Sequence, residues 1–349
     1  MLNWRSGAGA GFRGRKIVLS CSCSLLLLLF VSASAFAQTG AWARQRAGTM
    51  AWLKAVFFLD QNRGWAVGSK GTVLQTLDGG NTWKPRGASA EDIVRDIFFI
   101  DDQNGWLVCE VNAYQLKTAE EPRAYLLKTT DGGNSWKRIE IKGFDVEAIL
   151  VRAVFTRSGR GWAFGEAGSI YTTHDAGETW SWVKSPTRRL LLGGMFVDDD
   201  RGWIVGAGAT IIQTSDGGET WYQPTLPQVE KTVRFTATSF VDNRRGWAVG
   251  SAGNVYRTIN GGRTWQRQEP GVLVDLLDVK FVNALEGWAV GAEGTIISTK
   301  DGGEHWTTER SGTEHLLERV FFTDRNHGWA VGFGGTVVAF LRNETSATK

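Results

Sequence analysis

The sequence has little cysteine and little histidine, with three and four of these residues among 349. Cys21 and Cys23 lie in an apolar stretch near the N-terminus, which leaves Cys109 as the one thiol of the remaining sequence and excludes an internal disulfide there. We expect Cys109 to be a packed, unreactive thiol at the end of a buried strand. The histidines are scattered over separate repeats, so the sequence predicts neither a metal site nor a cofactor: His174, His305, His315 and His327.

A helical hydrophobic period is absent after residue 37. Short segments of alternating polar and apolar residues occur instead, which predicts an all-β chain.

An excess of one charge is absent too. The formal net charge is +3, but four of the 39 Lys and Arg and none of the 36 Asp and Glu fall within residues 1–37. The remainder, with 35 basic and 36 acidic residues, lacks the basic excess of nonspecific nucleic-acid binding, so no nucleic-acid partner is expected.

Residues 1–37 have the pattern of a secretory signal peptide. A basic start that ends at Lys16 precedes the apolar run Ile17–Val31, and Ala35-Phe36-Ala37 matches a signal-peptidase site. We predict cleavage after Ala37 and export of the chain that follows. The alternative is an uncleaved anchor, because the stretch from Ile17 to Ala37 is nearly long enough to span a membrane.

A repeat with a period near 41 residues fills the rest of the sequence. A Gly-Trp pair occurs seven times, and a phenylalanine lies six residues before each of these glycines. Several short strands per period of this length are typical of a β-propeller blade. The tryptophans of the pairs are Trp65, Trp106, Trp162, Trp203, Trp247, Trp288 and Trp329, and the phenylalanines are Phe58, Phe99, Phe155, Phe196, Phe240, Phe281 and Phe322.

A second motif, Asp-Gly-Gly-x-Thr-Trp or a close variant, follows only six of the seven pairs; we call it the Asp box. The last repeat therefore has no closing strand before the polar tail 342–349. Near the N-terminus, Trp42–Gly48 resembles the closing strands Trp265–Gly271 and Trp306–Gly312 of other repeats. We predict that Trp42–Gly48 completes blade 7, which closes a ring of seven four-stranded blades over residues 38–341 and covers an open sheet edge.

The acidic residue of the Asp box recurs at fixed spacing, which is compatible with chemistry or with a structural turn. We favour the turn, because the carboxylate can accept backbone N–H groups of its own loop and the tryptophan buries a large area. One box has asparagine, which keeps the acceptor and loses the charge, so ionisation is not required. The box residues are Asp78, Asp131, Asp175, Asp216, Asn260 and Asp301.

The full unit, F-x-D-x-x-x-G-W-A-V-G-x-x-G-x-I-x-x-T-x-D-G-G-x-T-W, resembles the repeat of the photosystem II stability and assembly factor family, and the match runs from Trp42 to Phe340. The box alone is similar to that of sialidases and other Asp-box propellers. The family resemblance implies an exported, non-enzymatic scaffold of the periplasm or thylakoid lumen, peripheral to the membrane at most. The implied partner is a membrane-complex subunit, which is the photosystem II reaction-centre precursor in a photosynthetic host.

The rival hypothesis is an Asp-box glycoside hydrolase or a carbohydrate-binding propeller of the cell envelope. A glycosidase needs two carboxylates at opposed positions. Asp96 and Asp278, near the start of two innermost strands, are the candidates, although no motif distinguishes them. The tyrosines at Tyr171, Tyr222 and Tyr256 fit packing positions and not a nucleophile. We therefore assign no catalytic residue.

Partner binding is predicted from what varies within the unit. The turn before each Gly-Trp pair carries arginine in three neighbouring blades, and arginine suits carboxylate-bearing partners. The alternative is a solvated turn in which these arginines pair with nearby residues such as Asp198, Asp199, Asp200 and Asp242. The candidate binding residues are Arg157, Arg160, Arg201, Arg244 and Arg245.

The opposite face of the propeller offers a second candidate surface. Basic residues near the start of the innermost strands would ring the channel mouth there, and an insertion around residues 110–125 of blade 2 adds a loop with Lys117, Glu120 and Glu121. No sequence feature decides between the faces. The candidate residues on this second face are Lys54, Arg95, Arg152, Arg319, Tyr114 and Arg123.

Overall fold

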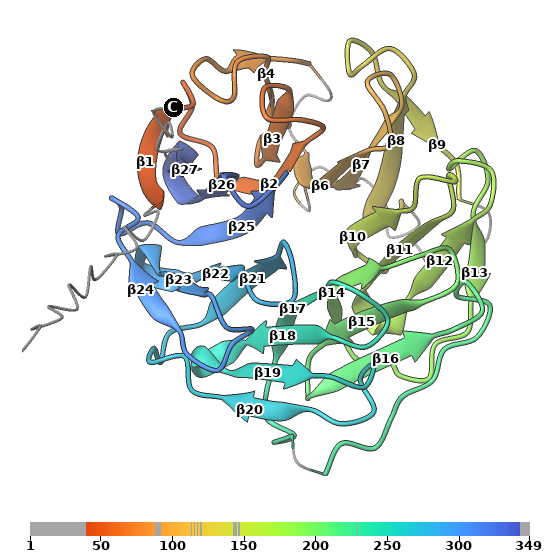
Figure 1. Ribbon diagram of the computed structural model, residues 1–349. Helices are drawn as coiled ribbons and strands as arrows, with labels where there is room; N and C mark the ends of the chain where they lie inside the picture. The colour runs from red at the N-terminus through yellow and green to blue at the C-terminus, as the bar shows by residue number, and fades with distance from the viewer. Residues whose placement is uncertain are drawn as a thin grey trace, which may run out of the picture. The chain divides into compact units, whose positions relative to one another are not determined.

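The computed structural model describes residues 40–342 apart from 88–91, 113, 115, 117, 119–120, 142–144, 146 and 228. The predicted signal peptide, residues 343–349 of the tail, and Lys117 and Glu120 of the insertion lie outside the described residues. The described chain forms seven antiparallel sheets that follow one another around a central channel, as Figure 1 shows. The predicted all-β, seven-bladed propeller is confirmed.

Each blade is one sheet, and its strands run in chain order from the channel outward, except that the outermost strand of blade 7 is the N-terminal strand. Blade 1 has β2 (Leu53–Phe58), β3 (Gly64–Gly68), β4 (Val73–Thr76) and β5 (Lys84–Pro85). Blade 2 has β6 (Ile93–Phe99), β7 (Gly105–Glu110), β8 (Ala124–Thr129) and β9 (Lys137–Ile139). Blade 3 has β10 (Leu150–Phe155), β11 (Gly161–Gly165), β12 (Ile170–Thr173) and β13 (Ser181–Val183).

Blade 4 has β14 (Leu191–Phe196), β15 (Gly202–Gly206) and β16 (Thr210–Thr214). Blade 5 has β17 (Phe235–Phe240), β18 (Gly246–Gly250), β19 (Val255–Thr258) and β20 (Gln266–Gln268). Blade 6 has β21 (Leu276–Phe281), β22 (Gly287–Gly291), β23 (Ile296–Thr299) and β24 (Thr307–Glu309). Blade 7 has β25 (Leu317–Phe322), β26 (His327–Gly332), β27 (Thr336–Arg342) and the N-terminal strand β1 (Gly40–Arg46).

Short 3₁₀ turns connect the second and third strands of four blades: η2 (Glu166–Gly168), η3 (Ser251–Gly253), η4 (Ala292–Gly294) and η5 (Phe333–Gly335).

Blade 4 differs from the prediction of four strands. Its outermost strand is reduced to a single bridge between Gln213 and Tyr222. Pro224 and Pro227 follow this bridge, and proline has no N–H to donate to a sheet ladder, which explains the early end of the pairing.

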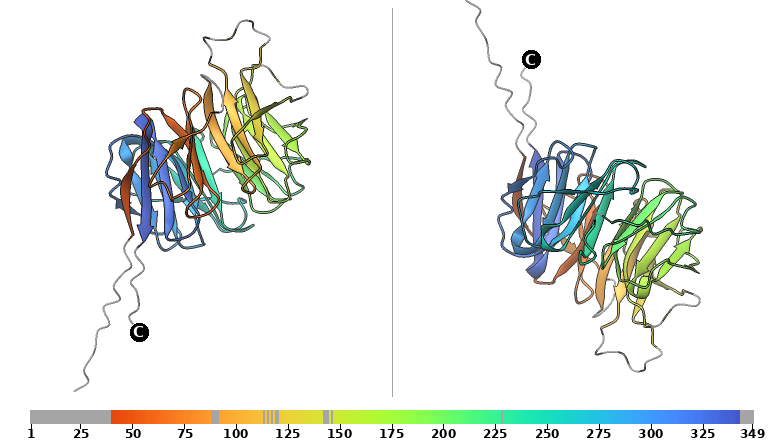
Figure 2. Two further views of the ribbon diagram at one scale, coloured as in Figure 1. Left: turned by 90° about the horizontal axis from the view of Figure 1, so that it is seen from above. Right: turned by 90° about the horizontal axis from the view of Figure 1, so that it is seen from below.

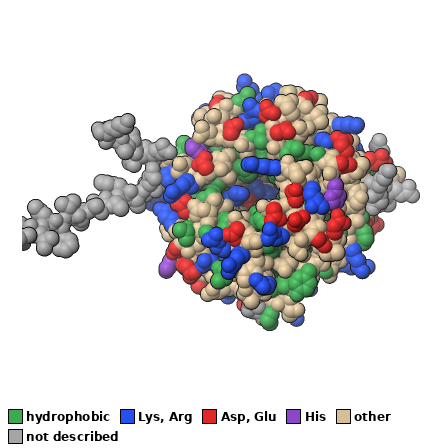
Figure 3. All heavy atoms as spheres, turned by 45° about the vertical axis from the view of Figure 1, so that its right-hand side comes forward, with side chains coloured by type: hydrophobic (Ala, Val, Ile, Leu, Met, Phe, Trp, Pro, Cys, Tyr) green, Lys and Arg blue, Asp and Glu red, His purple; other side chains and the backbone are tan. Residues whose placement is uncertain are grey.

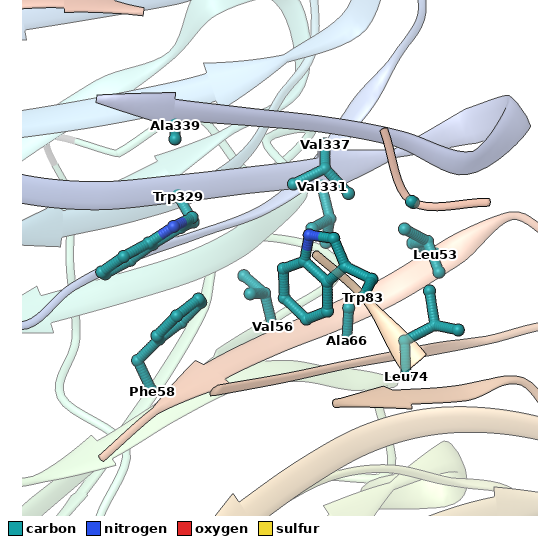
Figure 4. Packing of buried hydrophobic residues seen from close by; sticks show 11 residues of the cluster. Leu53, Val56, Phe58, Ala66, Leu74, Trp83, Trp329, Val331, Val337 and Ala339 are labelled. Carbon is teal, nitrogen blue, oxygen red and sulfur yellow. The ribbon is translucent and has the colours of Figure 1, made fainter. Parts of the chain in front are cut away.

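One aromatic arrangement joins every blade to the next. The Gly-Trp tryptophan of each blade stacks on the phenylalanine of the following blade, with ring centroids 3.4–4.0 Å apart. The box tryptophan of that following blade meets the same phenylalanine edge-on at 5.7–6.1 Å. Figure 4 shows the arrangement between blades 7 and 1, where Trp329 stacks on Phe58 and Trp83 lies beside it.

The glycine of each Gly-Trp pair makes room for this phenylalanine. A Cβ built on Gly64 would lie 2.5 Å from the ring of Phe58, its partner across the β2–β3 pair, and the remaining six glycines stand in the same relation to their own phenylalanines. Any side chain there would push the ring out of the stack. The repeated Gly-Trp pair is therefore a steric requirement of the packing between blades.

The ring closes as predicted at the N-terminal strand. β1 pairs with β27 in antiparallel register, with Trp42 opposite Phe340, and the two strands lie side by side in Figure 2. Trp42 meets Phe322 edge-on at 5.8 Å and 90°, which is the position of a box tryptophan in the other blades. Its indole N–H donates to Glu309 of blade 6 at 2.7 Å. The strand begins at Gly40, two residues before the predicted start, and ends at Arg46.

The Asp boxes form the closed turns predicted for them. In blade 2, Asp131 Oδ1 accepts the N–H of Ser135 at 2.9 Å and the hydroxyl of Thr129 at 2.7 Å, and Oδ2 accepts the hydroxyl of Ser135 at 2.6 Å. Asn260 keeps this geometry, because its Oδ1 accepts the N–H of Thr264 at 3.0 Å and its amide donates to the hydroxyl of Thr264 at 2.8 Å. In the Asp131 box the hydroxyl donates to the side chain, whereas in the Asn260 box the side-chain amide donates to the hydroxyl, and the turn is the same.

Cys109 is completely buried in the core between blades 1 and 2, as expected. Burial raises the pKa of its thiol to about 12, so the thiolate is suppressed at neutral pH. The predicted burial of this thiol is confirmed.

We expect Trp42→Ala to lower the free energy of unfolding by about 3–5 kcal/mol, because it removes a buried indole from the closure of the ring. Equilibrium unfolding in urea, followed by tryptophan fluorescence, measures the change. Trp182→Ala is the matched control, because Trp182 is 59% exposed on β13. Equal losses for the two variants would contradict the role given to Trp42.

We expect Asp131→Asn to leave the urea midpoint at pH 7 almost unchanged and Asp131→Ala to lower it, because asparagine supports the same turn at Asn260. The hydrogen bonds from Ser135 lower the pKa of Asp131 to about 2. The contribution of ionised Asp131 to the free energy of unfolding is therefore lost as pH falls from about 4 to about 2. Unfolding midpoints measured across that range should fall more for the wild type than for the Asn variant.

Candidate binding sites at the two ends of the channel

The propeller has two faces with different loops. On the box face, the turn between the first and second strands meets the Asp box of the same blade, as where the N–H of Gly79 donates to Asn62 O at 2.9 Å. On the linker face, the turn between the second and third strands meets the segment that enters the blade, as where the N–H of Ser69 donates to Trp52 O at 3.0 Å. The two faces predicted from the repeat are thus defined by contacts.

Four charged side chains meet inside the channel: Asp96, Arg152, Asp278 and Arg319, which we call the channel charge cluster. They occupy the same position, three residues before the stacked phenylalanine, in blades 2, 3, 6 and 7. Arg152 reaches Asp278 across the channel at 3.4 Å. Arg319 reaches Asp96 at 3.7 Å and Asp278 at 3.9 Å. The cluster bridges opposite walls and separates the two channel mouths.

Each carboxylate of the cluster also holds the backbone of the next blade. Asp96 accepts the N–H of Ala153 at 3.2 Å, and Asp278 accepts the N–H of Val320 at 3.0 Å. Burial raises the pKa of each carboxyl from an ordinary 3.8 to about 6, against the opposing effect of the Arg152 charge. Both candidates for catalysis, Asp96 and Asp278, are therefore bound to backbone amides of the inner strands and to arginines, and these contacts give them a structural role.

The other basic candidates of the linker face are spread around the ring. Lys54 lies over the ring of Trp52 and pairs with Glu318 at 3.6 Å. Arg95 pairs with Glu110. In the insertion of blade 2, Arg123 pairs with Glu166 at 3.5 Å and Tyr114 is 98% exposed. Each of these three cations and the two arginines of the cluster therefore has a carboxylate partner within the chain.

The arginines of the box face divide into two groups. Arg160 pairs with Asp200 at 3.5 Å, Arg201 with Asp198 at 2.9 Å and Arg245 with Asp242 at 2.6 Å. These pairs are the local alternative considered for such turns, and exposed pairs of this kind add little stability. The side chains of Arg157 and Arg244 are exposed and have no hydrogen bond or ion pair among the described residues.

Sequence reasoning missed a cavity of about 280 Å³ at the box-face end of the channel. Its walls include the residue just before the stacked phenylalanine in three blades: Phe57, Phe98 and Phe321. Arg157 also lines it. The sequence signal that could have found it is that the residue before the stacked phenylalanine varies between blades, whereas the phenylalanine itself does not. In the face shown in Figure 3, Lys and Arg side chains lie in and around a central hollow and alternate with Asp and Glu.

No group of three or more His, Cys, Asp or Glu among the described residues is placed to hold a metal ion. Within the same residues, no helix is long and apolar enough to cross a membrane.

Seven blades, six of which carry an Asp box, form a ring that the N-terminal strand closes, and this architecture defines an Asp-box propeller. Comparison with known families agrees. The model of the family described as "Photosynthesis system II assembly factor YCF48" matches residues 34–95, 87–188, 178–271 and 268–341. The chain belongs to this family of assembly factors.

Individual relatives are distant. The chloroplastic photosystem II stability/assembly factor HCF136 of Arabidopsis thaliana is 29% identical over 128 residues, which are 35% of this chain and 28% of the relative. The rice protein of the same name is 30% identical over 128 residues, 35% of this chain and 27% of that one. The aligned region thus spans little more than a quarter of these curated relatives.

Solved structures agree on the fold. The structure described as YCF48 bound to D1 peptide superposes with a TM-score of 0.72 at 21% identity, covering 88% of this chain and 97% of that one. YCF48 from Cyanidioschyzon merolae gives 0.70 at 20% identity, covering 86% and 99%. A xyloglucanase from Xanthomonas campestris gives 0.65 at 13% identity, covering 89% and 55%. Propellers with and without enzymatic activity thus share this architecture.

We expect the channel charge cluster to give stability a measurable pH dependence. The raised pKa values mean that the folded state binds protons more tightly than the unfolded state. The contribution of these carboxyls is therefore largest below pH 4 and falls as pH rises to about 6. Urea unfolding at pH 4.5 and pH 7 should show a larger loss of stability on raising the pH for the wild type than for Asp96→Asn/Asp278→Asn. An identical loss in both proteins would exclude the cluster as the cause.

Proposed function

We propose that this chain is an exported, non-enzymatic docking scaffold that binds a segment of a photosystem II reaction-centre subunit during assembly. The observation that carries the proposal is the family match, which extends over residues 34–341 and so includes every blade. A structural relative at 21% identity has been solved with a D1 peptide bound, which supports a peptide-binding role for the fold in this family.

The absence of enzymatic activity is part of the proposal. A glycosidase acid and its partner carboxylate must both reach the substrate. Asp96 and Asp278 are instead buried and bonded to the backbone of the next blade and to the channel arginines. The likeness to the xyloglucanase, at 13% identity, concerns the fold alone.

Export supports the same role. The basic and apolar pattern of residues 1–37 predicts delivery to the periplasm or thylakoid lumen, and the curated relatives are chloroplastic. In that compartment the propeller would meet the lumenal or periplasmic segments of a membrane protein without spanning the membrane itself.

We propose the box face as the docking surface. Among the predicted box-face arginines, Arg157 and Arg244 have no side-chain ion pair with the described residues, so an acidic segment can bind them without first breaking an ion pair. Arg160, Arg201 and Arg245 extend the basic arc, with their charge balanced locally by aspartates. The predicted candidate cations of the linker face are engaged by carboxylates of the chain, and on this ground we choose the box face over that second surface: Lys54, Arg95, Arg123, Arg152 and Arg319.

The test is capture of photosystem II subunits from detergent-solubilised cyanobacterial membranes by the immobilised propeller. We expect Arg157→Glu/Arg244→Glu to reduce the captured reaction-centre subunit at least fivefold at low salt. Lys137→Glu/Lys184→Glu is the matched control, because both lysines are exposed on outermost or adjacent segments and the charge change is equal. Equal capture by the two double variants would exclude the box-face arginines.

The competing glycosidase hypothesis has its own test. We expect no turnover on a panel of xyloglucan, sialyl and other glycan substrates by the purified chain. Turnover that is lost in Asp96→Asn or Asp278→Asn would replace the scaffold proposal with a hydrolase.

A further inference from the structure

The box-face mouth of the channel has an aromatic wall that the repeat does not need. Phe57 lies 5.1 Å from both Phe98 and Phe321, measured between ring centroids, and Phe98 continues to Phe155 at 5.7 Å. Phe57, Phe98 and Phe321 are only partly buried. Together with Leu59 and Ile100 they line the cavity of about 280 Å³. Three partly exposed phenylalanines in one small cavity form an apolar binding surface.

Other blades use the same position differently. Ser239 of blade 5 accepts the N–H of Phe281 at 3.0 Å, and the sulfur of Met195 in blade 4 accepts the N–H of Phe240 at 2.6 Å. In these blades the residue joins its strand to the next inner strand. A phenylalanine ring offers no such lone-pair acceptor. The aromatic residues of blades 7, 1 and 2 therefore depart from the structural use of this position and need another explanation.

Two cations flank the aromatic wall. Arg157 of blade 3 lines the cavity beyond Phe155. Lys280 of blade 6 occupies the same position as the three phenylalanines, and its ammonium lies 5.9 Å from the ring of Phe321. Neither side chain has a hydrogen bond or ion pair among the described residues, and no Asp or Glu lines the cavity. Burial lowers the pKa of Lys280, against the opposing effect of the Asp278 carboxylate.

The channel below this cavity is crossed by the ion pairs of the channel charge cluster. The channel charge cluster bridges the walls three residues before the stacked phenylalanines, on the linker side of the aromatic position. A polypeptide segment that entered the cavity and continued along the channel would meet the channel charge cluster. A blind apolar cavity with cations at its sides suits a chain end that carries an apolar side chain and a carboxylate. The small volume favours one or two residues over a lipid-length chain.

We propose that the box-face mouth binds the C-terminal residue of a partner polypeptide, with its apolar side chain against Phe57, Phe98 and Phe321 and its carboxylate on Lys280 or Arg157. The inference deepens the proposed docking function, since it rests on the box face as the docking surface. It assigns specificity to a free chain end, which the family membership and the arginine arc do not.

The experiment compares two fluorescein-labelled hexapeptides that end in leucine and differ only in a free C-terminal carboxylate or a C-terminal amide. Fluorescence anisotropy with the full chain measures both dissociation constants. We expect the free acid to bind at least tenfold more tightly than the amide. Lys280→Met/Arg157→Gln should abolish this ratio, whereas Lys184→Met/Lys137→Gln, on the outer rim, should retain it.

Controls separate a lost site from a lost fold. Phe57→Leu should weaken the acid peptide at least fivefold while the thermal midpoint, measured for every variant, stays within a few degrees of the wild type. Competition with sodium octanoate distinguishes a fatty acid from a peptide end as the ligand. If octanoate displaces the labelled acid peptide at a lower concentration than the unlabelled acid peptide does, the choice of partner is overturned.

Equal binding of acid and amide, or binding of neither at millimolar concentration, would overturn the inference. The scaffold function is tested separately by capture of photosystem II subunits. Successful capture with equal acid and amide binding leaves the scaffold and excludes the chain-end site. Failed capture with a tenfold preference for the acid leaves a chain-end receptor for another partner.

Discussion

The stack of each Gly-Trp tryptophan on the phenylalanine of the next blade is the interaction on which the rest of the structure depends. It repeats seven times around the ring, and the edge-on box tryptophan holds each phenylalanine from the other side. Offset and edge-on aromatic pairs are each worth about 0.5–1.5 kcal/mol beyond the area they bury. Because every blade both gives a tryptophan and receives one, a missing blade would leave two exposed aromatic faces. Blade 7 has no Asp-box tryptophan of its own, and Trp42 of the N-terminal strand takes that edge-on place against Phe322.

The same arrangement frees the positions that face the channel. Once the stacks and the boxes hold the blades, the residues one and three places before each stacked phenylalanine are not needed for the repeat. They differ from blade to blade and make the channel wall asymmetric. At three places before, they form the channel charge cluster. At one place before, they form an aromatic wall flanked by Lys280 and Arg157. Function in a repeat protein is expected where the repeat is broken.

Charge pairing decides which of the many cations are available to a partner. Arg201 and Arg245 are each held by an aspartate of their own turn, whereas Arg157 and Arg244 are not. Local pairing does not remove a cation from an interface, but it lowers the gain from a new carboxylate, because one ion pair must be exchanged for another. The arc of arginines is therefore uneven in its binding capacity, although it is regular in sequence.

The sequence by itself determined the number of blades, the stacking residues, the turns of the Asp boxes and the closure at Trp42. All of these follow from short motifs at a constant period, and each unit repeats the same local rule. It also placed Arg152 and Arg319 near the channel, since their position within the unit was known. Only the tertiary structure decided that Arg152 meets Asp278 and that Phe57 shares a cavity with residues of blades 2, 3 and 7. Such contacts join units that are far apart in the chain, and a repeat predicts what each unit contains but not which side chains of different units meet across the ring.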